Sequence, residues 1–172
     1  GNASVRMGTP IDLEVHEGTD GRYYMLDCSR LLPPVRPHKS RKMEYLFRHF
    51  RPEFVQKYKK PLCSDAFSPF ILPKVEIAKK LDAEIREIHT DIVEAEEYLH
   101  NELIPCFVSI LHLIPPCFDQ VSIVIVLHIY GINIRYLGEI LDLCIKKQEF
   151  MMASKIMIEM VSRVIKDIIK ES

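Results

Sequence analysis

The alternation of hydrophobic and polar residues near the start of the chain predicts a β-hairpin. Ile11, Leu13 and Val15 are separated by single polar residues, which is the period of a strand with one buried face. An Asp-Gly pair at residues 20–21 favours a tight turn because it tolerates positive φ, and the following Tyr-Tyr-Met-Leu run supplies the returning strand. The prolines of residues 31–37 exclude regular structure and predict a linker.

Helical periodicity begins after this linker. A basic stretch at residues 40–51 and a shorter one that starts at Pro52 predict two helices, and the Pro- and Ser-rich residues 61–73 predict a loop. The longest predicted helix covers residues 74–103 and carries an apolar seam with 3-4 spacing. The seam consists of Ala78, Leu81, Ile85, Ile88, Ile92, Ala95 and Leu99. We favour a long helix packed on its own domain, with a self-associating coiled coil as the alternative.

The last part of the chain is also helical in pattern. Prolines bracket a second apolar piece at residues 106–114, and the all-apolar run 121–130 suits a central core helix. Gly131 ends that helix and Asn133 can cap the next one, residues 134–147. A final apolar stripe consists of Phe150, Ala153, Met157, Met160, Val164 and Ile168.

These elements predict a mainly α protein with a small amino-terminal β-hairpin, an α+β fold. The helices are expected to form a multi-helix packed domain with one long amphipathic helix. We divide the chain into residues 1–37, the hairpin and Pro-rich linker, and residues 38–172, the helical domain. With 172 residues, 48% of them hydrophobic and 27% charged, the chain has enough apolar material for a core.

Charge is unevenly distributed, although the formal net charge is only −1. Residues 22–60 hold eleven Lys or Arg against three acids, a balance of +8, whereas residues 74–102 hold nine acids against four bases. Such asymmetry indicates either a surface for nucleic acid or an acidic partner, or two faces that attract each other within the fold. The intramolecular interpretation is favoured, and the partner-binding interpretation stays open.

No set of residues has the spacing of a catalytic or metal site. The seven histidines are scattered, and Cys63-Ser64-Asp65 lacks a neighbouring His or a Gly-rich turn to support nucleophilic catalysis. Walker and dinucleotide fingerprints are absent. A helix-turn-helix around Gly131 is disfavoured, because the second helix offers only Arg135 before Glu139 and Asp142. The sequence predicts no enzyme activity, no metal and no cofactor, with a cysteine-dependent enzyme as the remote alternative.

The cysteines and the termini bear on location. Five cysteines without a Cys-x-x-Cys pair, and no signal peptide, are typical of a reduced cytoplasmic protein with buried thiols. The apolar run 121–127 is shorter than the ~20 residues that cross a bilayer. The chain starts without Met and ends within a helical pattern, so we expect a piece of a longer protein.

Two stretches resemble the clustered mitochondria (Clu) family. Residues 17–34 have the pattern G-x-D-G-R-x-Y-x-L-D-x-x-R-x-x-P-P, and residues 130–138 have the pattern G-I-N-x-R-Y-L-G. The motif residues of the first stretch are Gly18, Asp20, Gly21, Arg22, Tyr24, Leu26, Asp27, Arg30, Pro33 and Pro34. Those of the second are Gly131, Asn133, Arg135, Tyr136 and Gly138. Their chemistry is structural: glycines and Asp20 for the turn, Tyr24 and Leu26 for the core, Gly131 and Asn133 for the helix junction.

The resemblance implies a function as well as a fold. Clu proteins are large cytosolic proteins needed for mitochondrial distribution, and they associate with messenger RNAs and the translation machinery. By this resemblance the chain would be the end of a Clu domain with the helical region associated with translation initiation factor three, without the family's tetratricopeptide array. The alternative is a protein-protein interaction scaffold module of a different multidomain protein, without RNA binding.

Partners follow from the charge pattern and the resemblance. We expect messenger RNA or ribosome-associated proteins, other domains of the full-length protein, and no membrane insertion; a homo-oligomer is not favoured. Cations neutralise phosphates, and aromatic faces can stack on bases. The candidate RNA or acidic-partner contacts are Arg41, Lys42, Arg48, Lys57, Lys59 and Lys60.

Overall fold

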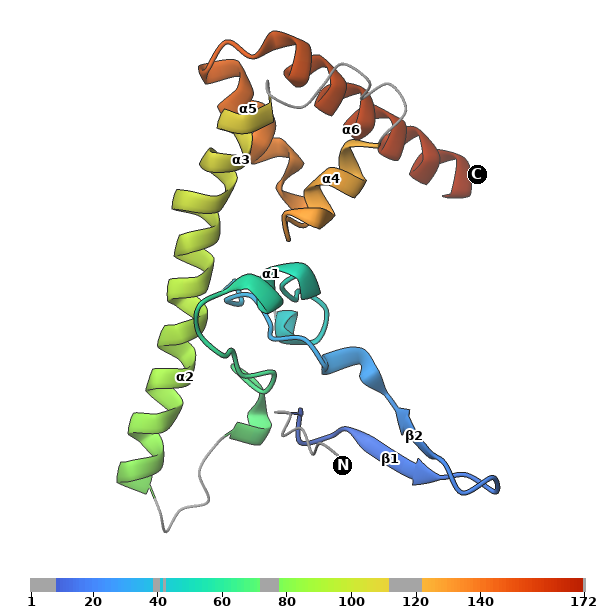
Figure 1. The fold of residues 1–172 in the computed structure, drawn as a ribbon, viewed down its shortest axis with the longest axis vertical. Helices are drawn as coiled ribbons and strands as arrows, with labels where there is room; N and C mark the ends of the chain where they lie inside the picture. The colour runs from blue at the N-terminus through green and yellow to red at the C-terminus, as the bar shows by residue number, and fades with distance from the viewer. Residues whose placement is uncertain (1–8, 39–40, 42, 72–77, 112–121, 172) are drawn as a thin grey trace, which may run out of the picture. The chain divides into compact units, whose positions relative to one another are not determined.

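The structure is a computed structural model, and it describes residues 9–38, 41, 43–71, 78–111 and 122–171 (Figure 1). The chain is mainly helical with one small antiparallel sheet near the amino terminus, so the predicted fold class is confirmed. It divides into two compact units, Gly1–Glu96 (unit 1) and Glu97–Ser172 (unit 2). The predicted domain division between residues 37 and 38 stays a prediction.

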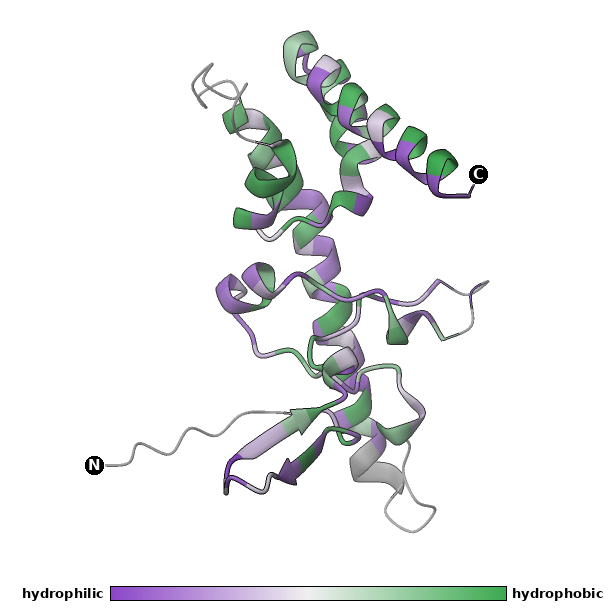
Figure 2. Cartoon of the chain, turned by 90° about the vertical axis from the view of Figure 1, so that its right-hand side faces the viewer, coloured by the Kyte–Doolittle hydropathy of each residue, from purple (hydrophilic) through white to green (hydrophobic). Residues whose placement is uncertain are grey.

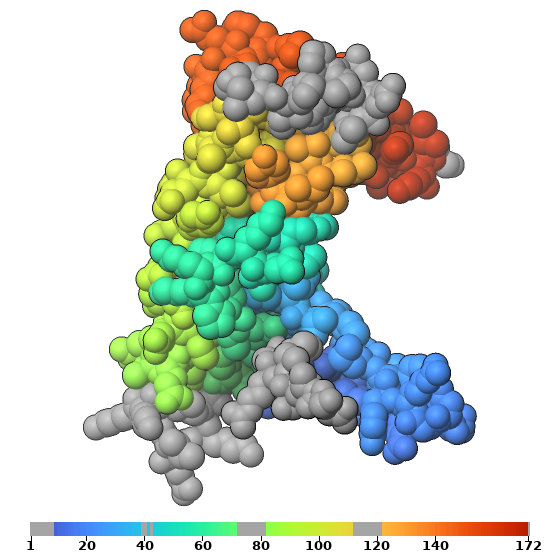
Figure 3. Space-filling view, viewed as in Figure 1, coloured from blue at the N-terminus to red at the C-terminus, as the bar shows by residue number. Residues whose placement is uncertain are grey.

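The hairpin of unit 1 pairs β1 (Glu14–Glu17) with β2 (Tyr23–Leu26) in antiparallel register. Gly21 sits in the turn with a φ of 73°, as the Asp-Gly pair predicts. Every residue of both strands is exposed, and the hairpin projects from the rest of the unit (blue in Figure 3). The prediction that Tyr24 and Leu26 face the core is therefore wrong: they are 47% and 46% exposed, because nothing described in unit 1 packs on either face of the hairpin.

The Pro-rich segment after the hairpin is part of the core of unit 1. Pro33, Pro34 and Val35 are buried, although these residues were predicted to be a linker. The N–H of Val35 donates to the Arg48 carbonyl at 2.8 Å, and the N–H of Phe50 donates to the Pro33 carbonyl at 3.0 Å. The prolines lack donors, but their carbonyls and the intervening N–H groups still pair with the neighbouring segment.

The helix predicted at residues 40–51 is wrong for the described part of that range. Only a 3-10 turn, Glu44–Leu46, forms there, and Met43 just before it has a left-handed φ of 62°. Backbone pairing of residues 48–50 with the buried Pro-rich segment competes with helix formation. α1 (Pro52–Lys57) follows, with proline in its first turn as predicted.

The long helix of the chain continues without a gap, but its hydrogen-bond pattern changes at one turn. α2 (Ala78–Tyr98) runs into a π turn (Leu99–Leu103) and then into α3 (Ile104–Ile110). A proline in a helix lacks a donor and clashes with the carbonyl four residues earlier. The wider π turn just ahead of Pro105, with the Ile104 N–H bonded to the Leu99 carbonyl, relieves that conflict, so the expected interruption at Pro105 does not occur.

The predicted seam of the long helix is buried along its described second half. Ile92, Ala95 and Leu99 are each no more than 1% exposed. The side chains of Ala78 and Leu81 lie outside the described residues. This burial supports the packed helix over the self-associating coiled coil.

Unit 2 is a cluster of helices. It contains α4 (Ile123–Ile129), a 3-10 turn (Ile134–Tyr136), α5 (Leu137–Lys146) and α6 (Phe150–Glu171). α5 packs against α3 and α6, and α4 also contacts α6. The core side chains of these helices include Phe107, Leu127, Ile140 and Ile156. At 22 residues α6 is one residue longer than α2, although the unbroken path through α2 and α3 is longer than either.

Among the described residues no single helix is long and apolar enough to cross a membrane. Two neighbouring stretches reach that length and apolar content only when they are taken together. They are Ile123–Ile129 and Ile134–Lys146, and the chain bends by 112° between them.

Candidate nucleic-acid interface

The predicted contact residues do not share a helix face. Arg41 and Arg48 lie on the irregular chain around Glu44, whereas Lys57, Lys59 and Lys60 lie at and after the end of α1. Lys42 is outside the described residues. The described candidates therefore form two clusters of cations, one on each of these segments.

The first cluster is organised by a buried carboxylate. Glu44 has no exposed surface and accepts the His38 backbone N–H at 2.6 Å. It also accepts Nη1 of Arg48 at 3.0 Å, and Nη1 of Arg41 lies 3.5 Å away. The His38 N–H, and then Arg48, hold the pKa of Glu44 below its ordinary value. Glu44 is therefore ionised at neutral pH and fixes this part of the chain in a loop.

A hollow of about 520 Å³ lies beside this carboxylate. It is lined by Arg36, Pro37, His38, Arg48 and Glu96. Nε of Arg36 is 2.9 Å from Oε2 of Glu96, and the Arg36 side chain is still 53% exposed. A guanidinium has five N–H donors, so one that is paired with a carboxylate keeps donors for a phosphate oxygen. The lining of the hollow thus combines two arginines with one glutamate.

The second cluster pairs with the acidic long helix. Nζ of Lys60 lies 2.8 Å from Asp91 and 2.7 Å from Glu94, both on α2. The hydrogen bonds to Asp91 and then Glu94 raise the pKa of Lys60 far above its ordinary value. With the pair of Arg36 and Glu96, this supports the intramolecular interpretation of the charge asymmetry for part of the basic segment. Arg41, Lys57 and Lys59 keep exposed side chains.

The aromatic residues of the basic segment divide into two groups. Phe50 and Phe54 are buried and stack at 4.8 Å between ring centroids, with Tyr58 continuing the stack at 5.4 Å. Tyr23, Tyr24 and Phe47 are exposed, at 74%, 47% and 63%. Only the exposed group is positioned to meet a base.

The first family motif forms the turn and a buried charge centre. Asp20 accepts the backbone N–H of Arg22 at 3.1 Å and the hydroxyl of Tyr24 at 2.7 Å, as a turn residue should. Asp27 is left-handed, with a φ of 51°, and caps the 3-10 turn Cys28–Arg30. Arg30 is 3% exposed and ends that turn.

Arg30 joins three separate segments of unit 1, a role that sequence reasoning missed. Its Nε and Nη2 donate to the two carboxylate oxygens of Asp12 at 2.8 Å, and Nη2 also donates to Asp65 at 2.6 Å. Its guanidinium lies 5.1 Å from the centroid of the Phe70 ring. Asp12 and Asp65 lie outside the motif and follow no periodicity with it, so only the motif position of Arg30 hinted at a special role.

The second motif forms the predicted helix junction. Gly131 has a φ of 78°, and the Ile132 N–H bonds to the Leu127 carbonyl, which is a Schellman ending of α4. The side chain of Asn133 accepts the Arg135 N–H at 3.0 Å and caps the next turn. Tyr136 is buried and Arg135 is exposed. A Cβ on Gly138 would meet nothing within 4 Å, so no steric requirement accounts for this glycine.

The polar residues beside Cys63 make hydrogen bonds within unit 1. The Ser64 hydroxyl donates to the Leu31 carbonyl, and Asp65 is occupied by Arg30. No group of three or more His, Cys, Asp or Glu within the described ranges could hold a metal ion. Cys144 is buried, as predicted for the thiols, but Cys28 and Cys106 are exposed.

Two family models match this chain. Residues 1–36 match the Clustered mitochondria model, and residues 115–172 match the model of Translation initiation factor eIF3 subunit 135. A Clu segment is therefore followed by an eIF3 subunit 135 segment, in the order that the sequence resemblance predicts. No catalytic family is detected. No curated protein and no solved structure matches the chain.

Proposed function

We propose that this chain, which carries a Clu segment followed by an eIF3 subunit 135 segment, is a non-catalytic module of a Clu-like protein of the cytoplasm. The module acts in mitochondrial distribution and biogenesis through association with messenger RNA and the translation machinery. Both matched families support this reading, one through mitochondria and the other through translation initiation.

One observation carries the RNA part of the proposal. The hollow beside Glu44 brings Arg36, His38 and Arg48 together, with the exposed Arg41 nearby on the same loop. Guanidinium groups held by carboxylates are fixed in direction and keep donors for phosphate oxygens. The exposed Phe47 belongs to the same loop and offers a ring face for stacking on an unpaired base. Lys57 and Lys59 extend the positive surface.

The test measures the binding of a fluorescent single-stranded RNA to the whole chain, by fluorescence anisotropy, at low and at high salt. Binding should weaken as salt rises, because each neutralised phosphate releases counterions. Arg36→Glu combined with Arg41→Glu should lower the affinity by on the order of tenfold at low salt and flatten the salt slope by about one per lost contact. Both chosen side chains are more than half exposed, but each lies against a buried carboxylate, Glu96 or Glu44, so the affinity is compared only after circular dichroism shows that the double variant is folded.

The matched control reverses two exposed lysines of unit 2, Lys166 and Lys170, to Glu. It changes the net charge equally and should leave most of the RNA affinity in place. If the control and the arginine variant lose affinity equally, attraction is unspecific and the hollow is not the site.

The second candidate function is a protein-interaction scaffold without RNA binding. It is favoured by the ion pairs of Lys60 with Asp91 and Glu94, which direct one of the predicted RNA contacts to the fold itself. No RNA binding at low salt by a chain with native helicity would reject the RNA proposal and leave the scaffold.

A further inference from the structure

The last helix has two apolar faces. Its inner face includes the buried Met152, Ala153 and Ile156, which pack within unit 2. Its outer face carries nine large apolar side chains that are each half or more exposed. They are Phe150, Met151, Met157, Ile158, Val161, Val164, Ile165, Ile168 and Ile169. Apolar positions recur along α6 to its end (green between purple in Figure 2), and a contiguous exposed apolar face of this size is typical of an interaction site.

The outer face has the spacing of a helix-pairing seam. Met151, Ser154, Ile158, Val161, Ile165 and Ile168 are separated by three and four residues in turn. A repeat of this kind keeps one line of side chains facing a partner helix. The inner residues Met152, Ala153 and Ile156 all fall outside the seam, so packing within unit 2 does not use it.

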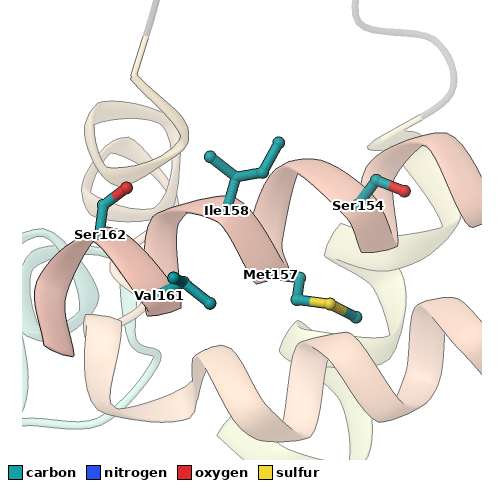
Figure 4. Close-up of a pocket in the computed structure, with 5 residues that line it drawn as sticks. All are labelled: Ser154, Met157, Ile158, Val161 and Ser162. Atoms are coloured by element: carbon teal, nitrogen blue, oxygen red, sulfur yellow. The ribbon is translucent and has the colours of Figure 1, made fainter. Parts of the chain in front are cut away.

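A hollow of about 340 Å³ lies on this seam (Figure 4). It is lined by Ser154, Met157, Ile158, Val161 and Ser162. The first four stand at positions i, i+3, i+4 and i+7, which is the set of four that receives one side chain of a facing helix in knobs-into-holes packing. In Figure 4 Ser154, Ile158 and Ser162 form a row along the helix, with Met157 and Val161 beside it. The two small serines leave room for an aliphatic knob.

Charge on the seam suits a copy of itself. Between residues 157 and 169 no seam residue is charged. The residues that lie beside the seam on the helix surface are also uncharged: Met157, Ser162, Val164 and Ile169. The charges of this stretch lie at Glu159, Arg163, Lys166 and Asp167, off the seam, and Glu159 pairs with Arg163 at 2.8 Å in the same helix. Two identical neutral faces meet without repulsion, whereas nothing on the seam selects a charged partner.

The area is adequate for a stable pair. Nine side chains at roughly 80 Å² of newly buried area each give on the order of 700 Å² per copy. A standard specific interface buries ~800 Å² per partner. We propose that α6 pairs with α6 of a second copy of this chain, with Ile158 and Ile165 acting as the central knobs.

The test is sedimentation of the whole 172-residue chain over a wide concentration range. The wild type should show a reversible monomer–dimer equilibrium. Ile158→Glu combined with Ile165→Glu should raise the dimer dissociation constant by on the order of a hundredfold, because two apolar anchors per copy become like charges. Lys166→Glu, off the seam, is the matched control and should keep the dimer.

A milder variant guards against unfolding. Ser154→Glu leaves every apolar side chain in place and puts a charge into the hollow, so it should also favour the monomer. Far-ultraviolet circular dichroism should be unchanged in all variants. A wild type that stays monomeric throughout, or a dimer that survives both seam variants, would overturn the proposal. A monomer that instead binds an unrelated amphipathic helix would assign the seam to another protein.

Discussion

At the scale of single residues, two helix endings with the same hydrogen bonds use different amino acids. Gly131 lies two residues after the end of α4 and Gln148 two residues after the end of α5, and both have a left-handed φ, 78° and 62°. In each case the next residue donates to a carbonyl five positions back, Ile132 to Leu127 and Glu149 to Cys144. Glycine adopts this conformation at no steric cost, whereas glutamine does so with strain.

Gln148→Gly should therefore stabilise the protein by about 1 kcal/mol, and Gly131→Ala should destabilise it by about as much or more. Urea unfolding followed by circular dichroism measures both changes. The two substitutions act on the same motif in opposite directions, so each is the other's control. A loss of stability in Gln148→Gly would mean that the glutamine side chain makes a contact worth more than its backbone strain.

His89 is held in its neutral form. Its Nε2 accepts the Phe67 backbone N–H at 3.1 Å, and the two rings stack with centroids 4.3 Å apart. Burial lowers the pKa of His89 below the ordinary value of 6.5. Between the lowered pKa and 6.5, the unfolded chain binds more protons than the folded one.

The stability contributed by neutral His89 should thus be fully present above pH 6.5 and decline as the pH falls below it. Unfolding titrations at a series of mildly acid pH values should show this slope. His89→Asn keeps an acceptor but cannot titrate, and should flatten it. If the slope persists in His89→Asn, another group controls the acid sensitivity.

At the scale of elements, unit 1 is joined less by regular structure than by Arg30. This side chain connects Asp12, just before β1, with Asp65 in the loop ahead of α2. Burial of a guanidinium is tolerated because two carboxylates surround it. The pKa of Asp12 is lowered mainly by its hydrogen bond from Arg30, which shows the same coupling from the other side.

Arg30→Ala should destabilise the protein by about 2 kcal/mol, because it leaves two partly buried carboxylates without their shared partner. Arg30→Lys keeps the charge but loses the fork that meets both oxygens of Asp12, so it should recover only part of the loss. Arg22→Ala, at an exposed motif arginine, is the control and should change stability by less than about 0.5 kcal/mol. Equal effects of the two alanine variants would contradict the structural role of Arg30.

Elements defined by local chemistry were predictable from the sequence, and those defined by distant pairing were not. The turn at Gly21, the cap at Asn133 and the start of α1 at Pro52 depend on neighbours within a few residues. The absence of a helix at residues 43–51 depends instead on pairing with Pro33 and Val35 and on the buried Glu44. For the same reason the candidate hollow, which combines Arg36 and Arg48 with Glu96 of α2, could not be assembled from spacing.

At the scale of the whole molecule, part of the positive charge of residues 22–60 is neutralised by acidic residues of the same unit. Lys60 and Lys59 are adjacent in sequence, yet only Lys60 is paired with Asp91 and Glu94. Net charge alone therefore overstates the positive surface available to a partner. The contribution of each cation depends on whether α2 already neutralises it.

Lys60→Glu should lower the urea midpoint of unfolding, because it places three carboxylates together, whereas Lys59→Glu should leave the midpoint nearly unchanged. RNA affinity should respond in the opposite way. When both folded variants are compared, Lys59→Glu should lose more affinity than Lys60→Glu. Both measurements use the same two proteins. An equal fall in midpoint for both variants would show that the ion pairs of Lys60 do not hold in solution.

The exposed hairpin has a consequence for proteolysis. A sheet of only two strands, with every strand residue at the surface, gains little from burial and opens at low cost. α1, in the same unit, is different: its Phe54 is buried in an aromatic stack, so the helix cannot open without exposing that ring. A protease added briefly should therefore cut the turn at residues 18–21 well before it cuts α1, and the cleaved protein should keep the rest of unit 1 folded.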